Sequence, residues 1–117
     1  MNDVIARYLD CWNETDPAVR RKLIEEVWAA EADYIDPMAE AHGRDAIDAT
    51  IGAVQQQFPG FVFTLAGAVD AHHRQARFTW ALGPEGAEPP IVGFDVAVTD
   101  EDGRIVTVLG FLDKVPG

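Results

Sequence analysis

The sequence is poor in cysteine and in positive charge. Its single cysteine, Cys11, cannot form an internal disulfide or a cysteine-based zinc site, and its helical spacing favours a small buried side chain over a nucleophile. Nine Lys and Arg residues stand against 20 Asp and Glu residues, which gives a formal net charge of -11. Such a surface repels phosphate groups, so nucleic acid and anionic membranes are not expected as partners.

Long apolar runs and phosphate-binding motifs are also missing. The first ten residues, MNDVIARYLD, carry an early acid and no extended apolar segment, so neither a signal peptide nor a membrane span is predicted, and a reducing cytoplasm is the expected location. The patterns G-x-x-x-x-G-K and G-x-G-x-x-G do not occur, so no nucleotide cofactor is expected. His72 and His73 are adjacent and would point to opposite faces of a strand, so no metal is expected either.

What the chain does contain fits one compact domain over residues 1–117, since 48% of its residues are hydrophobic and can form a core. Residues 2–12 predict an amphipathic helix whose inward face holds Ile5, Tyr8, Leu9 and Trp12. A second helix is predicted within residues 15–28, with Asp16 as N-cap, Pro17 at the first position and Val19, Leu23 and Val27 one turn apart. The charge run within it, Arg20 to Glu26, is interpreted as a solvated face.

The rest of the chain predicts one more helix and mostly strands. Residues 31–36 favour a brief strand with Tyr34 and Asp36 on one side. A third helix is predicted over residues 45–57, ended by Pro-Gly, with a buried stripe of Ile47, Ile51, Val54 and Phe58. From residue 61 onward the pattern changes to strand-like runs at 61–71, 74–82, 91–99 and 104–114.

Three helices followed by antiparallel strands predict an α+β domain in which helices cover one face of a sheet. This order resembles the nuclear-transport-factor-2-like (NTF2-like) superfamily, and within it the SnoaL-like and ketosteroid-isomerase-like branch. The segments that carry the resemblance are RYL, YIDP, HGRDAI and GFDVAVTDEDGRIV. It covers nearly the whole chain. It implies a cone in which three N-terminal helices pack in the concave face of a strongly bent, mainly antiparallel sheet, with an apolar pocket at the open end.

The resemblance also implies a catalytic set. Tyr8 in RYL, Asp36 in IDP and Asp95 in GFDV occupy the matching positions. Ionised Asp36 would lift a proton from the carbon next to a carbonyl, while Tyr8 and a protonated Asp95 would donate hydrogen bonds to the enolate oxygen. The residue types fit this division, because two carboxyl groups in one apolar pocket do not both ionise easily. Asp95 lies within an apolar run, whereas Asp36 lies beside a loop.

Structural readings of the same residues stay open. Tyr8 is explained equally by a place in the core, and Asp36 by the end of a strand before proline. On strand 91–99, alternation separates the face of Asp95 from a far more apolar one with Val92, Phe94, Val96 and Val98. The pattern alone therefore predicts that Asp95 faces away from the core. The resemblance implies a homodimer through the outer sheet face, which would bury both sides.

The expected function is that of an isomerase or cyclase acting by acid/base proton transfer on a neutral apolar small molecule. The expected pocket lining, besides the catalytic set, is Trp12, Trp28, Tyr34, His42, Phe58, Phe78, Trp80, Val108 and Leu112. Small residues such as Gly93 and Gly110 indicate that the cavity differs in shape from a steroid pocket. The alternatives are a non-catalytic ligand-binding or dimeric assembly domain and, with least support, epoxide hydrolysis through Arg77.

Overall fold

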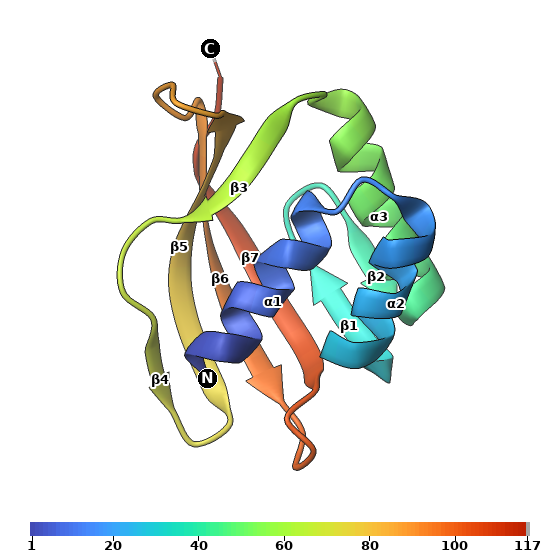
Figure 1. Ribbon diagram of the computed structural model, residues 1–117. Helices are drawn as coiled ribbons and strands as arrows, with labels where there is room; N and C mark the ends of the chain where they lie inside the picture. The colour runs from blue at the N-terminus through green and yellow to red at the C-terminus, as the bar shows by residue number, and fades with distance from the viewer. Residues whose placement is uncertain (117) are drawn as a thin grey trace.

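The computed structural model describes residues 1–116 and shows three helices against one curved sheet (Figure 1). The helices are α1 (Asn2–Asn13), α2 (Pro17–Val27) and α3 (Arg44–Gln57). The strands are β1 (Trp28–Ile35), β2 (Glu40–His42), β3 (Phe61–Leu65), β4 (Asp70–His72), β5 (Gln75–Pro84), β6 (Ile91–Thr99) and β7 (Ile105–Lys114). None of the helices in this part of the chain is long and apolar enough to cross a membrane.

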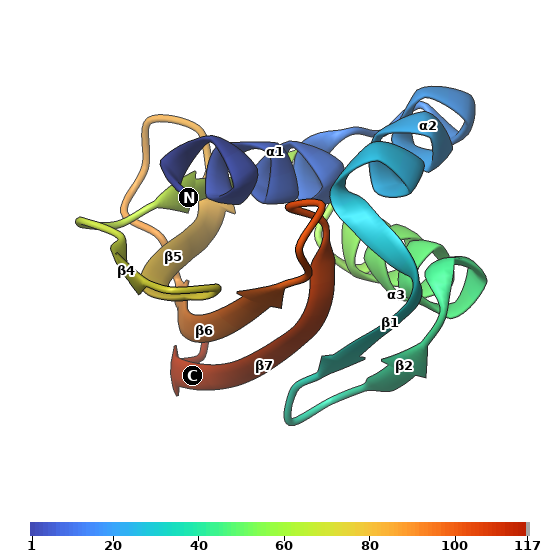
Figure 2. The same ribbon diagram turned by 90° about the horizontal axis from the view of Figure 1, so that it is seen from below.

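The sheet has the strand order β2-β1-β7-β6-β5-β3, with β4 paired to β5. Every pairing is antiparallel except that between β1 and β7, which is parallel. Figure 2 shows the sheet bending around α1, which lies on its concave side, while α3 lies beside β1 and β2. The prediction of an α+β fold with helices in the concave face of a bent, mainly antiparallel sheet is confirmed.

Local signals explain the helix ends. Asp16 caps α2 as predicted, because its Oδ1 accepts hydrogen bonds from the backbone N–H groups of Ala18 and Val19 at 2.9 and 3.2 Å. Helix α3 begins after Gly43, whose φ of 85° favours glycine, and ends before Pro59-Gly60. Strands β6 and β7 lie within one residue of the predicted bounds.

Other boundaries differ from the prediction because sheet pairing determines them. Trp28, assigned to the second helix, instead begins β1, which pairs with β7 and is longer than the predicted strand. The short β2 was missed. The run 61–71 is divided into β3 and β4, which pair with different parts of β5.

The buried side of helix α2 differs in part from the one predicted. Val27 is buried and Leu23 packs against the core as predicted, but Val19 is 46% exposed. Arg20 and Ile24 are buried in addition. Arg20 therefore does not belong to a solvated face. Its guanidinium donates to Asp48 Oδ1 and Gln55 Oε1, both at 2.7 Å, and so links α2 to α3.

The orientation of β6 corrects the expectation from its apolar pattern. Burial alternates along the strand, and the buried positions are Ile91, Gly93, Asp95, Ala97 and Thr99. The bulkier residues between them are only half-buried on the outer face. Small residues face inward here because large aromatic side chains from other elements fill the interior. Trp80 of β5, for instance, lies directly over Gly93.

Candidate functional site

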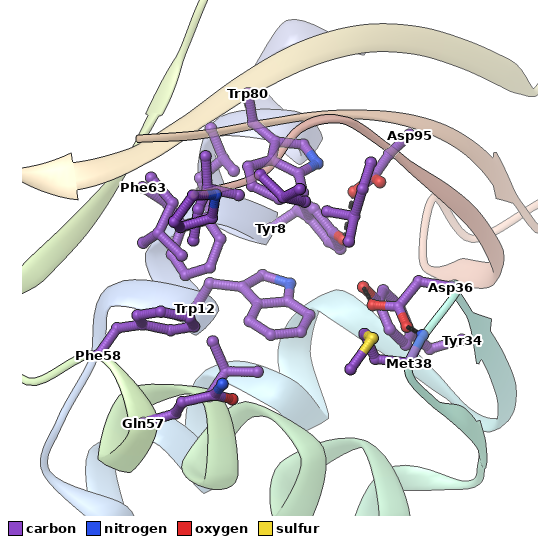
Figure 3. A pocket seen from close by; sticks show the side chains of 17 residues that line it. Tyr8, Trp12, Tyr34, Asp36, Met38, Gln57, Phe58, Phe63, Trp80 and Asp95 are labelled. Carbon is purple, nitrogen blue, oxygen red and sulfur yellow. Dashed lines mark hydrogen bonds between the residues drawn. The ribbon is translucent and has the colours of Figure 1, made fainter. Parts of the chain in front are cut away.

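A cavity of about 250 Å³ lies between α1, the end of α3 and the concave face of the sheet (Figure 3). Apolar and aromatic side chains form most of its wall, and hydroxyl and carboxyl groups gather at one end. Its volume is at the small end for ligand cavities, which commonly measure about 300–1,000 Å³. It is lined by Tyr8, Leu9, Trp12, Tyr34, Asp36, Met38, Val54, Gln57, Phe58, Phe63, Trp80, Leu82, Ile91, Asp95, Leu112, Val115 and Pro116.

The first polar pair at this end is formed by Tyr8 and Asp95. The Tyr8 hydroxyl donates to Asp95 Oδ2 at 2.7 Å, and the two residues are 1% and 2% exposed. Burial raises the pKa of Asp95 to about 6, and the hydrogen bond from Tyr8 opposes this rise. Burial also raises the pKa of Tyr8 well above its usual value, with the Asp95 carboxyl adding to the effect. The Tyr8 hydroxyl is thus kept as a donor, and Asp95 can donate while it is protonated, below about pH 6.

The second pair joins Tyr34 and Asp36. Tyr34 lies two residues before Asp36, and its hydroxyl donates to Asp36 Oδ2 at 2.5 Å. Asp36 Oδ1 accepts from the backbone N–H groups of Met38 and Ala39, each at 2.8 Å. A backbone N–H can only donate, so these two bonds are made to an acceptor oxygen, as in a carboxylate. The Asp-Pro turn therefore fixes the carboxyl group as well as ending the strand.

Two glycines allow this arrangement. A Cβ atom at Gly110 would lie 2.8 Å from Asp95 Oδ1 and 3.2 Å from Asp36 Cβ. The two acidic residues therefore approach β7 at the point where it has no side chain. A Cβ atom at Gly93 would lie 2.0 Å from the Trp80 ring, which occupies that space. The small residues noted in the sequence thus admit a carboxyl pair and an indole rather than widening the cavity.

Some polar atoms at the site remain without a partner. Within residues 1–116, Asp95 Oδ1 and Trp12 Nε1 are buried and make no hydrogen bond. An unpaired buried polar group costs about 1–3 kcal/mol, and such costs concentrate where a ligand or proton is handled. Trp28 Nε1 is unpartnered too, but Trp28 does not line the cavity.

The predicted site residues fall into two groups. Besides Tyr8, Asp36 and Asp95, the cavity wall includes Trp12, Tyr34, Phe58, Trp80 and Leu112. Trp28, Phe78 and Val108 do not line it, contrary to expectation. They lie in the core, where Trp28 and Phe78 pack on the Tyr8 ring at centroid distances of 5.6 and 5.7 Å. Their side chains thus support Tyr8 from behind.

His42 does not line the cavity either. It is exposed on β2, and its ring contacts the carboxyl groups of Asp33 and Glu31. The hydrogen bond with Asp33 raises the pKa of His42, with a smaller contribution from Glu31. Arg77, considered for epoxide chemistry, donates to Asp70 Oδ2 at 2.8 Å on the exposed sheet surface, so it does not reach the cavity.

Several lining residues were not identified from the sequence. They are Leu9, Met38, Val54, Gln57, Phe63, Leu82, Ile91, Val115 and Pro116. Most are ordinary apolar positions whose role depends on the curvature of the sheet. Leu9 and Val54 lie on helix faces that the sequence predicted to be buried, so their apolar pattern could have identified them as lining residues. No lining residue of the described chain is Lys, Arg or His, which argues against an anionic ligand.

Comparison with known proteins agrees with this fold. A family model described as a SnoaL-like domain matches residues 5–108. A proposed isomerase of the SnoaL-like family from Agrobacterium tumefaciens is 40% identical, with a TM-score of 0.90 over 95% of each chain. This chain belongs to the SnoaL-like family.

More distant SnoaL-like and NTF2-like structures share the fold alone. An NTF2-like protein of unknown function from Exiguobacterium is 24% identical, with a TM-score of 0.75 over 94% of this chain and 98% of that one. A proposed polyketide cyclase from Sinorhizobium meliloti is 18% identical, with a TM-score of 0.73 over 92% and 93%. A search of curated protein sequences finds no significant match.

Potential metal ligands among residues 1–116 of this SnoaL-like domain do not cluster. No group of three or more His, Cys, Asp or Glu side chains suited to hold a metal ion occurs within the described residues. Burial raises the pKa of the Cys11 thiol to about 12, which disfavours the reactive thiolate. The titratable groups of the cavity wall are the carboxyl groups of Asp36 and Asp95 and the hydroxyl groups of Tyr8 and Tyr34.

Proposed function

We propose that this SnoaL-like protein is an isomerase or cyclase that transfers protons next to the carbonyl group of a small, neutral, apolar substrate. The observation that carries the proposal is the placement of a buried Tyr8–Asp95 pair and a hydrogen-bonded Asp36 at the same end of one apolar cavity. The similarity to a proposed isomerase of the same family supports it.

The proton transfer follows from the roles of the three residues. Asp36 takes a proton from the carbon next to the carbonyl, so a C–H bond breaks and an O–H bond forms. The electron pair moves to the carbonyl oxygen, which becomes an enolate. Protonated Asp95 and the Tyr8 hydroxyl donate hydrogen bonds to this oxygen, the latter by turning its proton away from Asp95 Oδ2. In an isomerisation, Asp36 then returns the proton to another carbon. In a ring closure, the enolate carbon forms a C–C bond to a second carbonyl, the π pair of that carbonyl moves to its oxygen, and this oxygen takes the proton held by Asp36.

The test is proton exchange with solvent. We expect wild-type protein to catalyse deuterium incorporation next to the carbonyl in part of a panel of small cyclic ketones. Asp36→Asn removes the base and should lower the rate by at least about 100-fold. Asp33→Asn, on the strand that ends just before Asp36 but outside the cavity, is the matched control and should keep the wild-type rate.

Phenols, which mimic the enolate, provide an independent reading. They should bind wild-type protein, and Tyr8→Phe should weaken their binding about 10-fold through loss of one hydrogen bond. The competing possibility is a non-catalytic ligand-binding domain, favoured by the three hydrogen bonds that already occupy the Asp36 carboxyl. Ligand binding without exchange for any ketone, and without a difference between wild type and Asp36→Asn, would establish that alternative.

A further inference from the structure

Most of the hydrogen-bonding capacity of the Asp36 carboxylate is already used. A carboxylate offers about four lone-pair positions, two on each oxygen. Oδ1 accepts from the N–H groups of Met38 and Ala39, and Oδ2 accepts from the Tyr34 hydroxyl. One position remains, and it is on Oδ2. The oxygen available for proton abstraction is therefore the one that Tyr34 shares.

The Tyr34 hydroxyl is held in place from several directions. Tyr34 is 4% exposed, and its ring lies 5.3 Å from that of Trp12 and 6.4 Å from that of Trp28. Its backbone pairs with Ala41 of β2 and Val108 of β7, so it lies within the sheet rather than at an edge. A hydroxyl fixed in this way defines the direction from which Asp36 Oδ2 is approached.

We propose that Tyr34 is a positioning residue that orients the Asp36 carboxyl for proton transfer. Its hydroxyl donates to Asp36 Oδ2 while the turn N–H groups hold Oδ1, so the free position of Oδ2 faces a fixed direction. During the transfer, the substrate proton goes to the open position of Oδ2, and Tyr34 keeps its own proton and continues to donate. For its catalytic meaning the inference rests on the proposed function.

Among the side chains around Asp36, Tyr34 is the one that donates a hydrogen bond to its carboxyl group. The titratable groups that face this pair are Asp95 from β6 and Tyr8 from α1, and Tyr8 is engaged with Asp95. Burial raises the pKa of the Tyr34 hydroxyl, and the Asp95 and Asp36 carboxyls raise it further, so it remains a proton donor. Basic side chains are absent from the cavity wall formed by the described residues.

The test is a carbon-13 NMR titration of the aspartate carboxyl groups, with Asp36→Asn used to assign the Asp36 signal. Tyr34→Phe keeps the ring and removes only the hydroxyl. We expect the midpoint of the Asp36 titration to move up by about one pH unit, which corresponds to the loss of one charged hydrogen bond. Tyr8→Phe removes the same group from the same cavity and is the matched control. It should change the Asp95 titration and move the Asp36 midpoint by less than Tyr34→Phe does, because it reaches Asp36 only through the charge of Asp95.

A second measurement covers the case in which Tyr34→Phe does not fold. The chain has two tyrosines, so in the Tyr8→Phe background Tyr34 is the single tyrosine left. Replacing it with 3-fluorotyrosine makes the hydroxyl a stronger donor and should move the Asp36 midpoint down. An Asp36 midpoint that stays put with either replacement would overturn the inference.

The titration needs no substrate, so its outcome is separate from that of the proton-exchange test. If wild type exchanges no ketone proton but the Asp36 midpoint responds to Tyr34, the proposed function fails while the hydrogen-bond assignment holds. With an active substrate, the low-pH limb of kcat/KM should move up in Tyr34→Phe by the same amount as the midpoint and should move by less in Tyr8→Phe. A limb that does not move would show that Tyr34 supports only the fold.

Discussion

Asp95 is the residue at which burial and function conflict most directly. Its carboxyl is 2% exposed, and one of its oxygens has no hydrogen-bond partner among residues 1–116. Burial raises its pKa from 3.8 to about 6, so between about pH 4 and pH 6 the folded protein holds a proton on Asp95 that the unfolded chain releases. The proton is what makes Asp95 a hydrogen-bond donor, and it is lost when the surrounding pH rises above the folded value.

This shift predicts a pH dependence of stability. Below about pH 4, Asp95 is protonated in both states and costs nothing, whereas above about pH 6 folding must bury its charge. The free energy of unfolding of wild type should therefore fall across this window, by at most about 3 kcal/mol. Asp95→Asn cannot ionise, so its stability relative to wild type should improve over the same range in urea unfolding followed by tryptophan fluorescence.

The control is Asp102→Asn, which lies in an exposed turn. Its free energy of unfolding should differ from that of wild type by the same amount at every pH in this window. Asparagine leaves amide hydrogens to satisfy, so Asp95→Asn carries a constant cost at every pH. Only the change of this stability difference with pH reports the ionisation of Asp95. A constant difference between wild type and Asp95→Asn from about pH 4 to pH 7 would show that Asp95 titrates alike in both states.

At the level of elements, α2 and α3 are joined through a residue that the sequence pattern assigned to solvent. Arg20 is 9% exposed and donates to Asp48, Gln55 and the Glu14 carbonyl oxygen. Its neighbour Arg21 makes exposed ion pairs with Asp45 and Glu25. Both arginines belong to one charge run, and burial distinguishes them.

We expect Arg20→Ala to lower the free energy of unfolding by about 3 kcal/mol, because it leaves Asp48 and Gln55 without their partner. Arg21→Ala should lower it by less than about 1 kcal/mol, since exposed ion pairs contribute little. Thermal or urea unfolding of the two variants at the same ionic strength measures the contrast. Equal losses would mean that the buried network adds nothing beyond an ordinary surface pair.

The helices and strands also show which features of the fold could be predicted from the sequence. The N-cap Asp16, the Pro-Gly stop after α3 and the bounds of β6 and β7 were predicted because their signals are local. The length of β1, the existence of β2 and the break between β3 and β4 were not, because pairing with distant strands determines them. Similarly, Tyr8, Asp36 and Asp95 were identified through a family resemblance. The Tyr34–Asp36 hydrogen bond required coordinates.

For the whole molecule, the outer face of the sheet remains the principal apolar surface to explain. Phe94 of β6 is paired directly with Phe111 of β7, which is 57% exposed, and Leu109 is 40% exposed. Half-buried valines of β6 lie on the same face. A continuous apolar patch of this kind is typical of an association surface, and we propose that it joins two copies of the chain.

We predict that the protein sediments as a dimer and that Phe111→Glu shifts it to a monomer, because a charge in the centre of an apolar interface cannot be solvated. Met38→Glu, at an 81% exposed position by the cavity mouth, is the control and should remain dimeric. Analytical ultracentrifugation measures both. A wild-type protein that remains monomeric at concentrations about 100-fold above those used in the proton-exchange test would contradict this arrangement.

The inward orientation of β6 has a consequence for folding. A slip of one residue in its pairing would bury its valines and Phe94 and turn Asp95 to solvent, so the strand's own pattern favours a competing register. The hairpin before β7 opposes this slip, because Asp100 Oδ1 accepts from the backbone N–H groups of Asp102 and Arg104 at 2.9 and 3.0 Å and holds the turn. The acid that serves the cavity is thus a point of frustration in the folding landscape. The turn at Asp100 selects the native pairing over a misfolded one in which the cavity lacks its proton donor.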